Sequence, residues 1–208
     1  KNAAAVAELT MGLLIAIDRR IPENVIDLKA GRWNKKKYSV AQGLYGRHLG
    51  IIGLGAIGLA VAERARAFGI HVYVVEKPAR SAQTRETLMR LGIEALSDLD
   101  RLLGTCDIIS LHVPSAPETK GLVNAAFLEK LQPGAIIINA ARGDVIEEEA
   151  LLGAMNDKGI RAGLDVYADE PASGEGEFSS ALARHPNTCG THHIGASTDQ
   201  AQTAVSEG

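Results

Sequence analysis

The sequence is poor in cysteine, in net charge and in long apolar runs, and each shortage excludes a class of protein. Its 208 residues include two cysteines, Cys106 and Cys189, and no Cys-x-x-Cys pair, so we expect neither a disulfide framework nor a metal site. A net charge of −3 offers no electrostatic basis for binding nucleic acid, and the basic run at 35–37 is typical of a solvated loop. The longest uncharged apolar stretch, residues 49–62, is interrupted by glycines and is shorter than the roughly 20 residues of a membrane span. These absences favour a cytoplasmic protein in a reducing compartment.

The amino end has the pattern of an amphipathic helix. Between residues 3 and 19, apolar side chains recur on one stripe at Val6, Leu9, Leu13 and Ile17. This pattern differs from that of a secretory signal peptide, so none is expected at this end. With 46% apolar and 23% charged residues, the chain has the composition of one globular domain with a sizeable core.

After a second short helix that leads to Gly31, strand and helix patterns alternate along the chain. The predicted strands are 49–53, 71–75, 107–111, 135–139, 160–165 and 188–191. The predicted helices are 60–68, 82–91, 96–103, 147–157 and the segment from Thr198 onward. Continuous apolar strands such as 136–138 require burial on both faces, which a parallel sheet covered by helices provides. We therefore predict an α/β fold, a Rossmann-type doubly wound parallel sheet with helices on both faces and an N-terminal helical arm.

The first of these strands ends in the pattern Gly-x-Gly-x-x-Gly and then becomes helical. Each glycine has a distinct expected role: Gly53 permits the tight turn, Gly55 lets a pyrophosphate approach the backbone, and Gly58 lets the helix lie close on the strand. The phosphates would then meet free N–H groups at a helix N-terminus, where the dipole favours negative charge. The pattern predicts a dinucleotide site.

The second strand ends in Glu76, which lies near the spacing expected for the acid that binds the adenosine ribose. The alternative is a solvated charge at the end of a strand. Because a carboxylate at this position repels a 2′-phosphate, NAD is favoured over NADP. Lys77 and Arg80 weaken that preference a little.

Three polar side chains, Arg142, Glu170 and His193, each follow a different predicted strand, at the edge where open α/β sheets bind ligands. Each has a structural alternative: a helix cap, a loop acid, and an ordinary histidine beside His192. Together they suit the oxidation of an alcohol. An imidazole accepts the hydroxyl proton near neutral pH, a carboxylate orients the ring and favours its protonated form, and a guanidinium binds a planar carboxylate in two places. No metal is required, because imidazolium and guanidinium share the charge that develops on the oxygen.

Three segments resemble, in sequence, order and separation, the three signatures of the D-isomer-specific 2-hydroxyacid dehydrogenases. They are residues 139–146 (NAARGDVI), 163–171 (GLDVYADEP) and 193–198 (HIGAST). The resemblance extends from about residue 6 to the end of the chain. It implies that Arg142 binds the carboxylate and carbonyl of the substrate, and that Glu170 pairs with His193 to handle the proton while NAD takes the hydride.

The sequence departs from the family pattern at two positions. His192 stands where the family usually has proline, which leaves the catalytic assignment open between two adjacent histidines; we choose His193 because it directly precedes Ile-Gly. Ala56 replaces an arginine often found inside the glycine motif, at a position that varies.

The resemblance also implies which residues meet the cofactor. The turn at 111–114 would line the adenosine side, Thr119 would lie on the following loop, and Asp165 would face the nicotinamide carboxamide. The residues expected to contact NAD are Gly53, Gly55, Ala56, Ile57, Gly58, Glu76, His112, Pro114, Thr119, Ala141, Asp165 and Gly195.

Within the family, residues 20–22, 31–38 and 193–202 are similar to the phosphoglycerate dehydrogenase branch. This similarity implies oxidation of 3-phosphoglycerate to 3-phosphohydroxypyruvate in serine biosynthesis. A glyoxylate or hydroxypyruvate reductase of the same family is the alternative. An NAD(H)-sensing scaffold similar to transcriptional corepressors is an alternative of another class, and the presence of all three catalytic side chains favours the enzyme.

The resemblance bears on domain organisation as well. It implies that residues 1–208 are the dinucleotide-binding domain, a fragment without the separate substrate domain of the family, and that the isolated fragment is inactive. It also implies a homodimer formed through the N-terminal helix and the arm around Trp33.

Overall fold

Seven parallel strands form one sheet whose strand order reverses near its centre. A computed structural model describes residues 2–206, and within them the order is β3-β2-β1-β4-β5-β6-β7. The strands are β1 (His48–Ile52), β2 (His71–Val75), β3 (Glu94–Leu96), β4 (Ile108–Leu111), β5 (Ile136–Asn139), β6 (Arg161–Leu164) and β7 (Thr188–Gly190). β1 and β4 are neighbours, so the two halves of the sheet diverge between them, at the point where doubly wound sheets bind ligands. The predicted Rossmann-type fold is confirmed.

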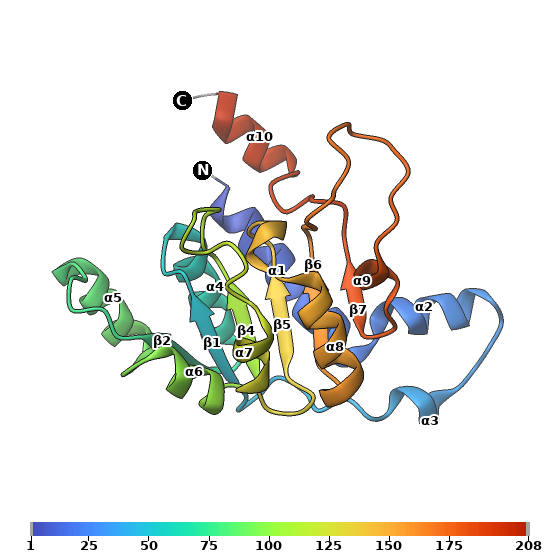
Figure 1. Cartoon of the computed structure of the whole chain (residues 1–208), viewed down its shortest axis with the longest axis horizontal. Coiled ribbons are helices and arrows are strands. Elements are labelled where there is room, and N and C mark those ends of the chain that lie inside the picture. Colours follow the sequence, from blue (N-terminus) through green and yellow to red (C-terminus); the bar gives the residue numbers. More distant parts are fainter. Residues whose placement is uncertain (1, 207–208) are drawn as a thin grey trace.

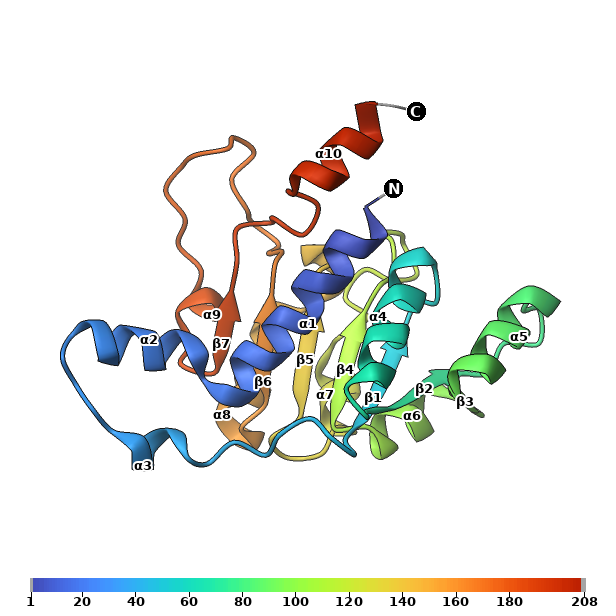
Figure 2. The ribbon, with the colours of Figure 1, turned by 180° about the vertical axis from the view of Figure 1, so that it is seen from behind.

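Helices cover both faces of this sheet. They are α1 (Ala3–Arg19), α2 (Ile21–Lys29), α3 (Lys35–Tyr38), α4 (Ala56–Ala67), α5 (Ala82–Leu91), α6 (Leu99–Thr105), α7 (Ala125–Glu129), α8 (Glu148–Lys158), α9 (Ala181–Arg184) and α10 (Asp199–Ser206), with a 3₁₀ turn, η1 (Gly143–Val145). α7 and α8 lie over one face (Figure 1), and α1 and α4 lie over the other (Figure 2).

β5 shows why the strands are apolar throughout. Ile136 and Ile138 pack in the cluster formed with α1 and α4, while Ile137 packs in the cluster formed with α6, α7 and α8. All three side chains are fully buried, and burial of each stabilises the fold by about 1.5–3 kcal/mol. The sheet is thus the middle layer of three.

The prediction of a helix over residues 96–103 is wrong at its start. Residues 94–96 form the edge strand β3, and Leu96 pairs with Val75 of β2. The helix begins after Asp98, whose carboxylate accepts a hydrogen bond from the Arg101 N–H at 2.8 Å and caps the helix. α4 also begins earlier than predicted, at Ala56, directly after Gly55.

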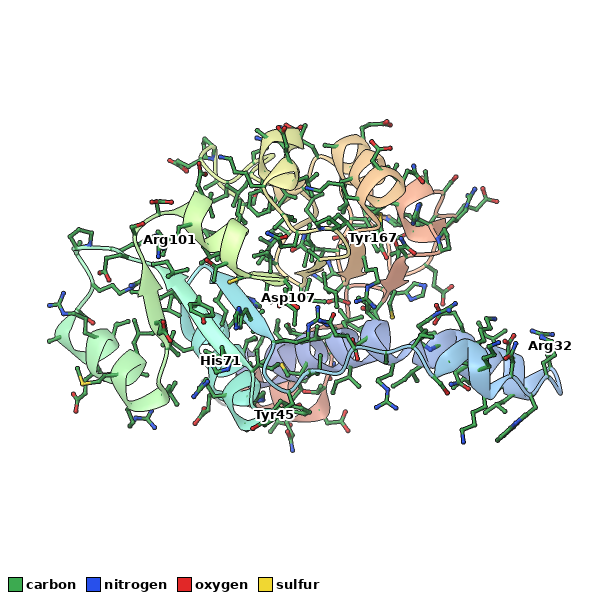
Figure 3. The ribbon with its side chains drawn as sticks, turned by 90° about the horizontal axis from the view of Figure 1, so that it is seen from below. Arg32, Tyr45, His71, Arg101, Asp107 and Tyr167 are labelled. Atoms are coloured by element: carbon green, nitrogen blue, oxygen red, sulfur yellow. The ribbon has the colours of Figure 1, made fainter. Side chains whose placement is uncertain are left out.

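A buried ion-pair network connects the first helix to one edge of the sheet. This edge lies opposite the edge that carries the glycine turn. Arg47 lies 3.2 Å from Asp18 of α1 and 2.5 Å from Asp107, which directly precedes β4. Figure 3 views this edge and labels Asp107 near its centre. After α1, the helices α2 and α3 form an arm that extends past β7. Arg32 lies toward the outer end of this arm (Figure 3).

Candidate cofactor and catalytic site

The three glycines of the turn between β1 and α4 are required for three different reasons. Gly53 has a φ of +97°, and a Cβ there would collide with the backbone carbonyl of His112. A Cβ on Gly58 would collide with the carbonyl of Gly53, so glycine lets α4 pack closely on the turn. Gly55 faces open space, with no described atom beyond its chain neighbours within 4 Å of an added Cβ. The turn is therefore tight on its protein side and open at Gly55.

The open side of this turn leads to the N-terminus of α4. The first helical hydrogen bond there runs from the Leu59 N–H to the Gly55 carbonyl at 3.0 Å. The N–H groups of Ala56, Ile57 and Gly58 precede that bond, so they are available to an anion. These residues fit the pyrophosphate of a dinucleotide.

His112 supports the turn from inside the protein. Its Nε2 lies 2.8 Å from the Ser110 hydroxyl, and its buried Nδ1 has no hydrogen-bond partner among residues 2–206. Burial lowers the pKa of the imidazole to about 4, so the ring is neutral at neutral pH. The His112 carbonyl is the group that excludes a Cβ at Gly53, so backbone and ring both belong to the packing under the turn.

The loop that follows β4 is closed by its own hydrogen bonds. The Thr119 hydroxyl donates to the Pro114 carbonyl at 2.5 Å and accepts from the Ala116 N–H at 3.0 Å. Ser115 donates to the Asp144 carboxylate at 2.5 Å, which joins this loop to the segment after β5. Pro114 and Thr119 therefore lie on a loop of defined shape beside the glycine turn.

Glu76 directly follows β2, the strand next to β1. Its N–H donates to the Leu96 carbonyl at 2.7 Å, while its side chain is 51% exposed. An exposed carboxylate at the end of this strand is where the ribose of a dinucleotide would lie.

A buried asparagine shapes the loop that carries Arg142. The Asn139 side chain, at the end of β5, accepts from the Ala141 N–H at 3.0 Å and donates to the Arg142 carbonyl at 2.9 Å. A Cβ on Gly143 would collide with the backbone of Tyr167, so the loop also packs closely against the segment after β6. Arg142 itself is exposed, with its guanidinium 2.6 Å from the Ala141 carbonyl.

A buried aspartate shapes the loop that carries His193. Asp165 accepts hydrogen bonds from the Ile194 N–H at 2.8 Å, the Gly195 N–H at 2.8 Å and the Thr191 hydroxyl at 2.7 Å. These bonds surround His193, which has a φ of +53°, a backbone conformation that costs a non-glycine residue roughly 1–2 kcal/mol. The Asp165 carboxylate thus holds a strained residue in place, a role that the sequence pattern did not reveal.

The two loops after β6 and β7 bring Glu170 and His193 together. Glu170 Oε1 lies 2.7 Å from His193 Nδ1, and the side chains are 36% and 49% exposed, respectively. An ionised carboxylate can only accept, so Nδ1 carries the proton and Nε2 is the ring nitrogen available to a substrate. This arrangement can accept a proton at Nε2 and stabilise the imidazolium that results.

The structure therefore places the expected site residues at one edge of the sheet. The glycine turn, Glu76, Arg142, Glu170 and His193 all follow the carboxyl ends of parallel strands, although no described contact joins Arg142 to the Glu170–His193 pair. Asn139 was not expected among the site residues. Its signal was available, since it is a polar residue at the end of a run of three isoleucines.

Within residues 2–206, no group of three or more His, Cys, Asp or Glu side chains is arranged to hold a metal ion. None of the helices in that range combines the length and apolar character needed to cross a lipid bilayer.

Comparison with known proteins agrees with this geometry. Residues 11–195 match the family model described as D-isomer specific 2-hydroxyacid dehydrogenase, NAD binding domain. The chain is 39% identical to a D-3-phosphoglycerate dehydrogenase of Methanocaldococcus jannaschii over 98% of its own length and 37% of that protein. It is 41% identical to a hydroxypyruvate reductase of Thermotoga maritima over 98% of its own length and 63% of that protein.

Solved structures show the same fold. A glyoxylate reductase from Paecilomyces thermophila superposes with a TM-score of 0.87 at 30% identity, over 99% of this chain and 60% of that one. The apo D-lactate dehydrogenase of Escherichia coli superposes with a TM-score of 0.84 at 29% identity, over 99% of this chain and 62% of that one. The chain thus spans between about a third and two thirds of the length of these relatives. The glycine turn, the strand order and a family match over most of the sequence agree, and the chain belongs to the D-isomer specific 2-hydroxyacid dehydrogenase NAD-binding domain family.

Proposed function

We propose that this domain serves an NAD-dependent dehydrogenase that transfers a hydride between NAD and a D-2-hydroxy acid. In this role Arg142 binds the substrate carboxylate, His193 exchanges the proton, and Glu170 orients His193. NAD, bound along the glycine turn and at Glu76, would be the hydride acceptor.

The observation that carries the proposal is the 2.7 Å contact between Glu170 Oε1 and His193 Nδ1. These residues lie on different loops and are 23 positions apart, so it is the fold that brings them together. Removing a hydride from a secondary alcohol also requires removal of the hydroxyl proton, and a histidine oriented by a carboxylate is suited to that step. Glu170 contacts His193, which supports the assignment of His193 over the adjacent His192.

For the substrate we propose 3-phosphoglycerate, with hydroxypyruvate or glyoxylate reduction as the second candidate. The names of the D-3-phosphoglycerate dehydrogenases that this chain resembles support the first, and the similarity to the Thermotoga maritima hydroxypyruvate reductase supports the second. We also propose that residues 1–208 are the cofactor domain alone and that a substrate domain is contributed by other sequence. The partial coverage of the relatives and the exposure of Glu170 and His193 support this division.

The test compares His193→Ala with His192→Ala in the full-length protein. Turnover of 3-phosphoglycerate with NAD, and of hydroxypyruvate and glyoxylate with NADH, is followed by NADH absorbance. His193→Ala should lower kcat by about 10²–10⁴-fold, with NADH affinity by calorimetry unchanged. His192→Ala is the matched control and should retain activity.

Two outcomes would overturn this assignment. Loss of activity in His192→Ala with retention in His193→Ala would move the acid–base role to His192. Activity that depends on neither histidine, together with intact NADH binding, would favour the NAD(H)-sensing scaffold.

A homodimer is the quaternary structure that we propose. α2 has no buried residue, and Ile26 and Leu28 are more than half exposed, as is Trp33 on the arm beyond it. An isologous contact between two arms would bury these side chains on both copies at once. Light scattering should give a dimer mass, and Ile26→Glu should shift it to a monomer mass. A monomer mass for the unmodified full-length protein would refute the homodimer.

Cytoplasmic localisation is also part of the proposal, and the two free cysteines are compatible with a reducing compartment.

A further inference from the structure

The segment that carries Glu170 has few contacts with the rest of the domain. Residues 168–177 are all exposed, so no buried side chain holds them in place. In the described part of the chain, two hydrogen bonds join this segment to other segments. One is the contact between Glu170 and His193, and the other runs from the Ala168 N–H to Glu148 Oε1 at 3.0 Å. The Glu148 carboxylate is therefore an anchor close to Glu170 that is independent of His193.

Glu148 is suited to this role because it lies on a fixed element. It is the first residue of α8, and the following turns of this helix place Leu151 and Met155 in the core, where both are fully buried. The Glu148 side chain is itself partly buried, whereas the neighbouring Glu149 is exposed. A hydrogen bond to an ionised carboxylate is stronger than one between neutral groups, so it can hold a backbone N–H of an exposed segment.

The peptide that Glu148 holds is also supported from a second side. Tyr167 directly precedes Ala168, and its side chain is buried. A Cβ on Gly143 would collide with the Tyr167 carbonyl and would lie 2.6 Å from the Ala168 nitrogen. Gly143 directly follows Arg142, so the loop that carries this guanidinium packs on the same peptide. Both supports come from the segment after β5.

We propose that Glu148 is a positioning residue that keeps Glu170 within reach of His193. Its hydrogen bond fixes the start of the turn on which Glu170 lies. Without this anchor an exposed segment samples many backbone conformations, and the entropy of ordering it opposes the contact that orients the imidazole. The inference rests on the proposed function, because it assigns Glu148 an effect on the proton transfer at His193.

The alternative is that Glu148 stabilises α8 and nothing else. Glu148 and Glu149 both lie in the first turn of this helix, where acidic side chains interact favourably with the helix dipole. Loss of either would then affect the helix about equally, although of the two it is Glu148 that contacts Ala168. Glu149→Ala is therefore the matched control, because it removes the same charge from the same turn.

The first measurement follows the ring of His193 directly. ¹⁵N NMR of this chain distinguishes a ring with its proton on Nδ1, which the Glu170 contact favours, from a ring with its proton on Nε2. Glu148→Ala should lower the Nδ1–H fraction, Glu149→Ala should leave it unchanged, and Glu148→Gln should retain most of it, because an amide oxygen can still accept from Ala168. Circular dichroism verifies the fold of each variant. If Glu148→Ala unfolds, Glu148→Asp keeps the charge but shortens the side chain by one methylene, and the same loss is expected.

The second measurement is turnover by the full-length protein, followed by NADH absorbance. Glu148→Ala should lower kcat by about tenfold or more, as expected for loss of one hydrogen bond to a charged group, with NADH affinity unchanged. In a Glu170→Ala background the same substitution should have little further effect, because Glu148 acts through Glu170.

Three results would overturn the inference. The first is an unchanged Nδ1–H fraction in folded Glu148→Ala, and the second is an equal fall in Glu149→Ala. The third is an undiminished effect on kcat in the Glu170→Ala background, which would show an action independent of Glu170. If the Nδ1–H fraction falls as expected but the unmodified full-length protein turns over none of the three substrates, the positioning role stands and the proposed function fails.

Discussion

The buried imidazole of His112 should make the stability of this domain depend on pH between about 4 and 6.5. Burial lowers the pKa of this ring from 6.5 to about 4 in the folded chain. A protonated ring would carry N–H groups on both nitrogens, and Nδ1 has no acceptor among residues 2–206. The unfolded chain therefore takes up the proton at a higher pH than the folded chain.

The sign and size of the effect follow from this difference. As pH falls through 6.5, the unfolded state binds a proton that the folded state excludes, so the free energy of unfolding decreases. The free energy of unfolding is unaffected by His112 well above pH 6.5. Below pH 4 the loss of this free energy is complete and reaches about 3 kcal/mol, because the pKa of His112 is lowered by roughly 2.5 pH units. Between pH 7 and pH 5 the expected loss from this residue is about 2 kcal/mol.

Urea unfolding at pH 7, 6 and 5 tests this expectation in the unmodified chain and in His112→Gln. Glutamine keeps a hydrogen-bonding group for Ser110 but does not titrate. The unmodified chain should lose about 2 kcal/mol more than the variant between pH 7 and pH 5. His71→Gln, at an exposed histidine, is the control and should not reduce the pH dependence. Equal losses in His112→Gln and the unmodified chain would refute the reasoning, because His112 would then titrate as it does in water.

Three further substitutions test the site and the fold. Gly53→Ala should abolish NADH binding in calorimetry and lower the melting temperature, because the φ of +97° and the His112 carbonyl exclude a Cβ at this position. The control is Gly153→Ala in α8, where no neighbour lies close to the added methyl, and it should be neutral or slightly stabilising. Equal effects of the two substitutions would contradict the steric account. Arg47→Met should lower the free energy of unfolding, measured in urea, by about 3–5 kcal/mol, because it leaves the buried Asp18 without its cation. A change below about 1 kcal/mol would show that the Arg47–Asp18 ion pair contributes little to stability. Asp165→Asn should cost about 2 kcal/mol in the same assay, since an amide cannot accept all three hydrogen bonds from the 191–195 loop, and unchanged stability would show that these bonds are not needed to hold it.

The regular elements were largely predictable because their signals are local. Glycine at 53, 55 and 58 and the isoleucines at 136–138 indicate a turn and a buried strand without reference to any distant residue. The first helix was predicted over 3–19, which is its observed extent. β3 was not predicted, because three residues with no apolar alternation become a strand only when they pair with β2.

The candidate site was predictable in its residue types more than in its arrangement. Arg142, Glu170 and His193 were identified from their positions after strands and from the signature segments. The roles of Asn139 and Asp165 in shaping two loops depend on hydrogen bonds to backbone groups, and a sequence pattern contains no such contacts. The pairing of Arg80 with Glu76 likewise depends on a turn that brings two neighbouring charges to one strand end.

By itself, the sequence determined the alternation of strands and helices, the glycine turn before α4 and the side chains that make up the candidate site. These properties come from residue identity and short-range spacing. Only the tertiary structure decided the strand order, the contact between Glu170 and His193, the left-handed backbone of His193 and the neutral state of His112. The physical reason is that each of these depends on burial or hydrogen bonding by residues from other strands, which local preferences do not specify.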